Sequence, residues 1–103
     1  MDDAGYLATL EATLVPFLAE NRPQLILYQA GVDPFVGDRL GRLSLSLDGL
    51  VARERLIARL ADGVPLASTV GGGYGDDALE IARRHVTAIL TLGEAMARDA
   101  AIP

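Results

Sequence analysis

The spacing of apolar residues along the chain predicts three helices. In the first, from about Asp3 to Glu20, apolar side chains recur at four-residue steps and form one stripe. The second, Leu47–Ala61, follows Ser46, a residue type that caps helix N-termini, and the third begins after Asp76 or Asp77. The stripes predicted to face a core are Tyr6, Leu10, Leu14 and Leu18 in the first helix, Leu50, Ile57 and Leu60 in the second, and Ala78, Ala82, His85, Ile89, Leu92 and Met96 in the third.

Two short apolar runs between these helices predict strands. Leu25–Ala30 is apolar with little alternation, which is typical of a parallel strand covered on both faces, and Pro65–Val70 is the second run. The order helix–strand–helix–strand–helix indicates an α/β fold, with two parallel strands joined by a crossover helix. Two strands alone would leave open edges and apolar faces. We therefore interpret the chain as a piece of a larger sheet, or as one that pairs with another chain.

Composition and charge narrow the possible partners. The 103 residues suffice for one small domain, and the net charge of −5 disfavours binding to nucleic acid or to an anionic membrane. The absence of cysteine excludes disulfides and thiolate metal sites. The start, Met1-Asp2-Asp3, lacks the features of a signal peptide, and no apolar run is long enough to cross a bilayer. We expect a soluble, cytoplasmic protein.

The loops after the two predicted strands carry the candidate chemistry. Because the carboxyl ends of parallel strands meet at one edge of a sheet, Asp33 and Tyr74 are expected to share one site. Asp33 fits a zinc ligand, but its position alone is more typical of a loop aspartate that binds nearby backbone amides. Tyr74 fits a donor to a developing oxyanion, but its position alone is more typical of a half-buried tyrosine that packs its ring. The run Gly71–Gly73 permits close backbone approach, but it does not match the dinucleotide-binding fingerprint.

Other polar residues are interpreted as structural. His85 is the only histidine and lies on the apolar side of the third helix, so we expect a packed, hydrogen-bonded core residue. Arg53, Glu54 and Arg59 are interpreted as a solvated helix face. None of them is expected to add to the candidate site.

Two motifs resemble the histone deacetylase superfamily. The stretch Leu25-Ile-Leu-Tyr-Gln-Ala-Gly-Val-Asp33, continued by Gly37-Asp-Arg-Leu-Gly-Arg-Leu-Ser-Leu-Ser46, is similar to the class IV and related bacterial branch. The second motif, Gly71-Gly-Gly-Tyr74 before a helix, follows at the distance that family shows, and Asp3-Ala-Gly-Tyr6-Leu7 is similar to its segment before the strand. The resemblance covers almost the whole chain. It implies that residues 1–103 are a C-terminal part of one deacetylase domain, with an arginase/deacetylase-like parallel sheet and flanking helices.

The resemblance also implies roles for four residues. Asp33 matches the family's last zinc ligand, Tyr74 the tyrosine that polarises the substrate carbonyl, and Gly72 and Gly73 the glycines lining the acyl-lysine channel. The implied reaction is zinc-assisted hydrolysis of acyl-lysine or another acetylated amine. The family's Asp-x-His zinc ligands and His-His general base have no match here. We therefore expect a fragment that is inactive alone; a non-catalytic α/β module that self-associates through its sheet edges is the alternative.

Overall fold

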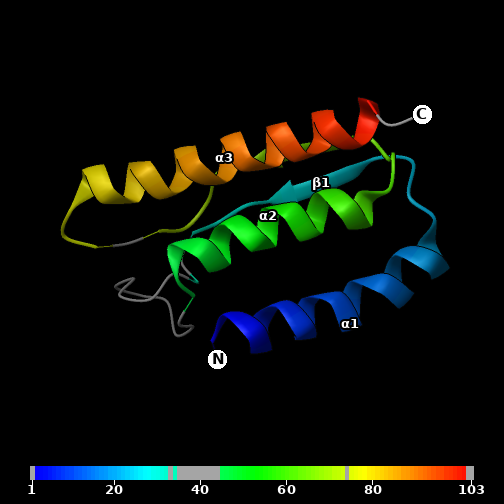
Figure 1. The fold of residues 1–103 in the computed structure, drawn as a ribbon, viewed down its shortest axis with the longest axis horizontal. Helices are drawn as coiled ribbons and strands as arrows, with labels where there is room; N and C mark the ends of the chain where they lie inside the picture. The colour runs from blue at the N-terminus through cyan, green and yellow to red at the C-terminus, as the bar shows by residue number, and fades with distance from the viewer. Residues whose placement is uncertain (1, 33, 35–44, 74, 102–103) are drawn as a thin grey trace.

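Three helices and a two-stranded sheet form the fold in the computed structural model, which describes residues 2–32, 34, 45–73 and 75–101 (Figure 1). The predicted order of helices and strands and the α/β class are confirmed. Each strand is one residue shorter at either end than the sequence predicted. In chain order the elements are α1 (Asp3–Asn21), β1 (Ile26–Gln29), α2 (Leu47–Ala61), β2 (Leu66–Thr69) and α3 (Ala78–Ala101).

Each helix begins after a residue whose side chain caps it, and for α2 and α3 the sequence analysis predicted that residue. Asp2, Ser46 and Asp77 each accept a hydrogen bond of 3.0 Å from a backbone N–H of the first turn of α1, α2 and α3 respectively. Helices α1 and α2 end at residues in the left-handed conformation, Arg22 with φ 43° and Asp62 with φ 48°. The helix bounds are therefore fixed by local side-chain chemistry.

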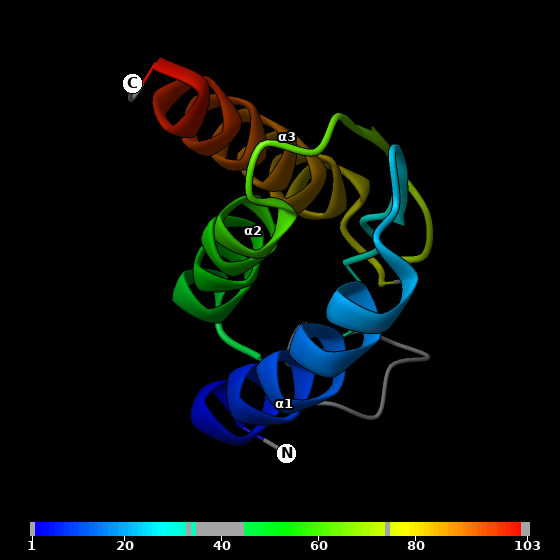
Figure 2. The same cartoon turned by 90° about the vertical axis from the view of Figure 1, so that its right-hand side faces the viewer.

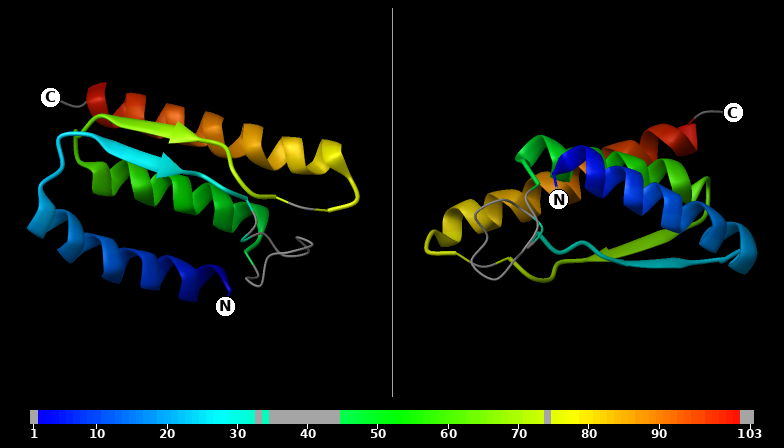
Figure 3. Two further views of the ribbon diagram at one scale, coloured as in Figure 1. Left: turned by 180° about the vertical axis from the view of Figure 1, so that it is seen from behind. Right: turned by 90° about the horizontal axis from the view of Figure 1, so that it is seen from below.

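The two strands are parallel, and Gln29 of β1 lies opposite Thr69 of β2. All three helices lie on one face of this sheet (Figure 3). Ile26 and Tyr28 point toward the helices and are half-buried, whereas Leu27 on the opposite face is 78% exposed. The prediction that the first strand is covered on both faces is thus wrong for the described part of the chain, because its helices all pack on the same side.

Helix α2 lies between α1 and α3 and contributes more buried residues than any other element (Figure 2). Ile57 and Ala58 of α2 pack against Leu92 of α3, and these three side chains are buried. The predicted stripe of α1 faces this core, although none of its residues is fully buried. The partly buried side chains around the cluster are Leu10, Leu14, Tyr28, Leu66, Ala95 and Met96.

The buried row of α3 differs from the predicted one. Ala88 and Leu92 are buried, but Ile89 is 45% exposed, and Ala78 and Ala82 are exposed as well. Leu92 of the predicted stripe is buried and His85 and Met96 are half-buried, whereas Ala88 takes the buried position predicted for Ile89.

A hydrogen-bonded cluster joins the N-termini of α1 and α2. The Asp3 carboxylate accepts from the backbone N–H of Ser46 at 2.8 Å and from its hydroxyl at 2.5 Å. These two hydrogen bonds lower the pKa of Asp3 below its ordinary value. Gly49 is buried beneath this carboxylate, and a Cβ there would collide with it. The glycine therefore lets α1 dock on α2.

Gly49→Ala is expected to lower the melting temperature, although alanine is the better helix former. The added methyl group would displace the Asp3 carboxylate and break its bonds to Ser46. Gly93→Ala in α3 is the matched control, because nothing lies within 4 Å of its Cβ position. That control should raise the free energy of unfolding by about 0.5–1 kcal/mol. Thermal unfolding followed by circular dichroism measures both, and equal shifts would contradict the collision.

Candidate functional site

The loops that leave β1 and β2 emerge side by side. Both strands run in the same direction, so their carboxyl ends lie at one edge of the sheet (Figure 3). The backbone N–H of Ala30 donates to the carbonyl of Thr69 at 2.8 Å, which extends the pairing to the point where the loops begin. The sequence prediction that these loops share one end of the sheet is confirmed.

The glycine loop after β2 touches the loop after β1. Gly72 and Gly73 have φ angles of 58° and 99°, a region that side chains strongly disfavour. A Cβ on Gly73 would lie 2.7 Å from Cγ2 of Val32 and 3.1 Å from Cγ2 of Ile81. The two loops are thus in direct contact at Val32 and Gly73, and only glycine permits this approach.

Asp33 and Tyr74 themselves lie outside the described residues. Their direct neighbours Val32 and Gly73 form the contact between the loops. The predicted roles of Asp33 as a zinc ligand and Tyr74 as a catalytic hydroxyl therefore stay predictions.

A buried polar cluster lies behind the end of β1. The hydroxyl of Tyr28 donates to Oε1 of Glu54 at 2.5 Å, and Nε of Arg53 donates to the same oxygen at 2.7 Å. Nη1 of Arg53 donates to the carbonyl of Gly31 at 2.7 Å. The guanidinium carbon also lies 5.8 Å from the centre of the Tyr28 ring. The cluster connects helix α2 to the loop that leads to Asp33.

Burial controls the electrostatics of this cluster. Arg53 and Glu54 are 3% and 0% exposed, and burial raises the pKa of Tyr28 well above its ordinary value, so its hydroxyl remains a donor. Nη2 of Arg53 and Oε2 of Glu54 are buried with no hydrogen-bond partner among the described residues. The positive and negative charges compensate each other inside the protein.

The interpretation of Arg53 and Glu54 as a solvated face is wrong. Arg59 is exposed as expected, with an exposed side-chain fraction of 65%. Arg53 and Glu54 fall instead on the same helical stripe as Leu50 and Ile57, at spacings of three and four residues. This spacing was visible in the sequence, but the charge of the two side chains pointed to solvent.

His85 reaches the glycine loop from helix α3. Its Nε2 lies 3.1 Å from the carbonyl oxygen of Gly72, and because a carbonyl only accepts, Nε2 carries the proton. It also lies 3.3 Å from the Cβ position of Gly73. The prediction of a packed, hydrogen-bonded histidine is confirmed, and its partner is the candidate loop.

Gln29 contacts both loops at the strand ends. Its Oε1 accepts from the backbone N–H of Gly31 at 3.2 Å, and its amide occupies the space that a Cβ on Gly71 would need. Sequence reasoning did not identify Gln29, since a polar residue at a strand end carries no distinctive signal.

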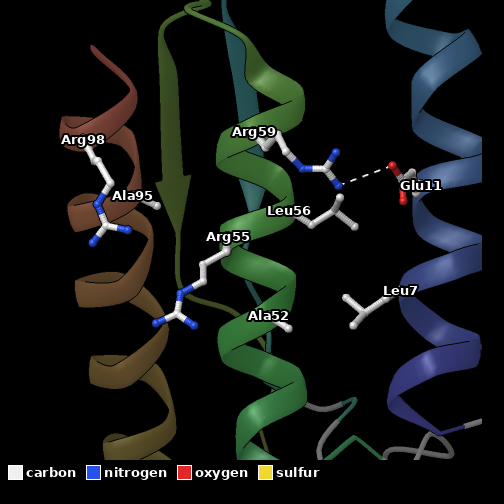
Figure 4. A pocket seen from close by; sticks show the side chains of 8 residues that line it. All are labelled: Leu7, Glu11, Ala52, Arg55, Leu56, Arg59, Ala95 and Arg98. Atoms are coloured by element: carbon white, nitrogen blue, oxygen red, sulfur yellow. Dashed lines mark hydrogen bonds and ion pairs between the residues drawn. The ribbon is translucent and has the colours of Figure 1, made fainter. Parts of the chain in front are cut away.

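A separate hollow lies on the outer side of the helices (Figure 4). It has a volume of about 550 Å³ and lies across α2, between α1 and α3. Arg59 and Glu11 form an ion pair of 3.3 Å at its rim, and Arg55 and Arg98 also line it. None of its lining residues comes from the loops after β1 and β2, so this hollow is not the candidate site.

The described part of the chain does not by itself form a metal centre. No group of three or more histidine, cysteine, aspartate or glutamate side chains within it is arranged to hold an ion. None of its helices is long and apolar enough to span a membrane.

The chain is similar to histone deacetylase sequences over most of its length. A family model described as the histone deacetylase domain matches residues 1–90. An uncharacterized protein of Picosynechococcus sp. is 45% identical over 87 residues, which are 82% of this chain and 29% of that protein. Histone deacetylase 2 of Arabidopsis thaliana is 37% identical over 71 residues, or 67% of this chain and 18% of that protein. Histone deacetylase RPD3 of Saccharomyces cerevisiae is 31% identical over 74 residues, which are 72% of this chain and 17% of that protein. The chain therefore spans less than a third of the length of each of these relatives.

Proposed function

Because this chain belongs to the histone deacetylase family, we propose that it is the C-terminal part of a zinc-dependent deacetylase acting on acyl-lysine or another N-acetylated amine. The observation that carries the proposal is the contact between Val32 and Gly73. These residues directly precede Asp33 and Tyr74, and consecutive Cα atoms are only about 3.8 Å apart. The contact supports one site that draws on both loops.

In this proposal the residues of the two loops have distinct roles. Asp33 supplies a carboxylate ligand to the metal, and the Tyr74 hydroxyl donates a hydrogen bond to the substrate carbonyl oxygen. Negative charge develops on that oxygen as water adds to the amide carbon. Gly72 and Gly73, which carry no side chain, form a backbone wall beside the acyl group.

Zinc cannot be held by the described residues of this chain. His85 is the only histidine, so the chain could supply at most one imidazole ligand. Asp33 would supply a single ligand, whereas a catalytic zinc needs three from the protein. The remaining ligands would have to come from a further part of the deacetylase domain.

The purified 103-residue chain is accordingly expected to be inactive toward an acetyl-lysine peptide and an acetylated polyamine, with or without added Zn²⁺. The measurement is release of acetate, with histone deacetylase RPD3 as the positive control for the peptide and polyamine deacetylase HDAC10 of Mus musculus as that for the polyamine. Zinc-dependent turnover by the chain alone would contradict the expectation.

A chimera tests the proposed activity itself. The matched segment of Arabidopsis histone deacetylase 2 would be replaced by the corresponding residues of this chain. We expect the chimera to deacetylate an acetyl-lysine peptide, and Tyr74→Phe to reduce kcat by about 100- to 1000-fold, the effect of losing an oxyanion donor. Thr13→Ala, an exposed change on α1, is the control that should leave activity unchanged. A folded chimera without activity, or a Tyr74→Phe variant at full activity, would refute the assignment.

A non-catalytic, self-associating module is the second candidate. It is favoured by the face of the sheet that the described helices leave uncovered, where Leu27 is 78% exposed beside Leu25, which is 55% exposed. Sedimentation velocity distinguishes the two candidates. A discrete dimer that Leu27→Lys dissociates would support the module, whereas a monomer would exclude it.

A further inference from the structure

We propose that Arg53 and His85 are positioning residues that hold the loops after β1 and β2 from the helical side of the sheet. Arg53 on α2 donates to the carbonyl of Gly31 at 2.7 Å, and His85 on α3 donates to the carbonyl of Gly72 at 3.1 Å. Each helix therefore holds one loop through a backbone oxygen. A hydrogen bond from a helix side chain to a loop carbonyl thus follows the carboxyl end of each strand.

The two anchored carbonyls occupy equivalent positions in the chain. Gly31 lies two residues before Asp33, and Gly72 lies two residues before Tyr74. Because two residues span at most about 7 Å, each anchor limits where the following side chain can go. That these anchors affect catalysis rests on the proposed function. That they restrain the loops rests only on the hydrogen bonds to the Gly31 and Gly72 carbonyls.

The burial of the Arg53 charge supports a role in positioning the loop after β1 rather than in stabilising the fold. Replacing a buried ion pair with apolar residues is commonly neutral or stabilising, so core stability alone gives no reason for a charged pair at this place. What an apolar side chain cannot do is donate to the Gly31 carbonyl. The second acceptor of the guanidinium, Oε1 of Glu54, fixes its orientation toward that carbonyl.

The His85 anchor acts where the two loops meet. Its ring lies 3.3 Å from the Cβ position of Gly73, the residue that touches Val32. A single side chain thus holds the Gly72 carbonyl and borders the contact between the loops. Loss of the imidazole would remove the hydrogen bond from α3 to the Gly72 carbonyl, while Val32 and Ile81 would still pack against Gly73.

Amide hydrogen exchange of the chain, followed by NMR, tests both anchors. His85→Leu should accelerate exchange at Gly72 and Gly73 by about five- to ten-fold, because losing the hydrogen bond to the Gly72 carbonyl makes the loop open more often, and it should leave Gly31 and Val32 unchanged. The double variant Arg53→Met/Glu54→Gln should accelerate exchange at Gly31 and Val32 and leave Gly72 and Gly73 unchanged. It leaves no uncompensated charge, and the amide oxygen introduced by Glu54→Gln keeps an acceptor for the Tyr28 hydroxyl.

Two further variants separate positioning from general stability. His85→Gln keeps an N–H donor on the same helix and should restore protection of the glycine loop. Ile57→Val, a core change that touches neither carbonyl, should accelerate exchange of the two loops to the same extent.

The proposal is overturned if either substitution leaves its own loop unchanged, or if each affects both loops equally, as Ile57→Val does. Exchange is measured without metal or substrate, so an inactive chimera would count against the proposed deacetylase and not against the anchors. Conversely, unchanged exchange in these variants would refute the anchoring role of Arg53 and His85 even if the chimera were active.

Discussion

Arg53→Met is expected to destabilise the protein by about 3–5 kcal/mol, because it leaves the Glu54 carboxylate buried without its compensating charge. Methionine retains most of the aliphatic volume, so the loss reports the charge and the hydrogen bonds rather than a cavity. Urea unfolding followed by circular dichroism measures the change. A loss of this size is a large fraction of the stability of a domain of about 100 residues.

Two variants control this experiment. Arg53→Met/Glu54→Gln should recover most of the lost stability, since it removes both charges and keeps the acceptor for Tyr28. Arg55→Met lies two residues away on the exposed side of α2 and should change the free energy of unfolding by less than about 0.5 kcal/mol. If Arg53→Met and Arg55→Met had similar small effects, the buried ion pair would be refuted.

Gly73→Ala is expected to cost about 2–4 kcal/mol. Part of the cost is conformational, because the φ angle of 99° is unfavourable for any residue with a Cβ. The remainder is steric, because the methyl group would press on Val32, Ile81 and His85. The same change should separate the two loops that carry the candidate site.

Gly63→Ala separates these two contributions. Gly63 has a φ angle of 83°, but nothing lies within 4 Å of its Cβ position. It should cost only the conformational part, about 1–2 kcal/mol. Urea unfolding measures both variants, and equal losses would show that the loop contact contributes nothing.

The family could be identified from the sequence because its motifs are local. The run Leu25–Asp33 and the glycines before Tyr74 lie in continuous segments, and the match to the histone deacetylase domain over residues 1–90 confirms the resemblance they indicated. The fold class followed from the same local patterns, since capping and apolar periodicity depend on near neighbours only.

The coverage of the sheet could not be predicted in this way. An apolar run such as Leu25–Ala30 indicates that both faces of a strand suit an apolar environment. It does not indicate which segment covers each face. In the described part of the chain the helices cover one face alone, and Leu27 on the other face remains exposed.

For the candidate site, the sequence by itself determined which loops carry Asp33, Tyr74 and the glycines, and that these loops share one end of a parallel sheet. Only the tertiary structure decided that Val32 touches Gly73, and that Arg53 and His85 hold the loop carbonyls. The physical reason is that a charged side chain is buried or solvated according to the partners it meets across the fold. Periodicity along the helix indicates the face on which Arg53 lies. The acceptors that hold Arg53 there are the Gly31 carbonyl in the loop after β1 and Oε1 of Glu54.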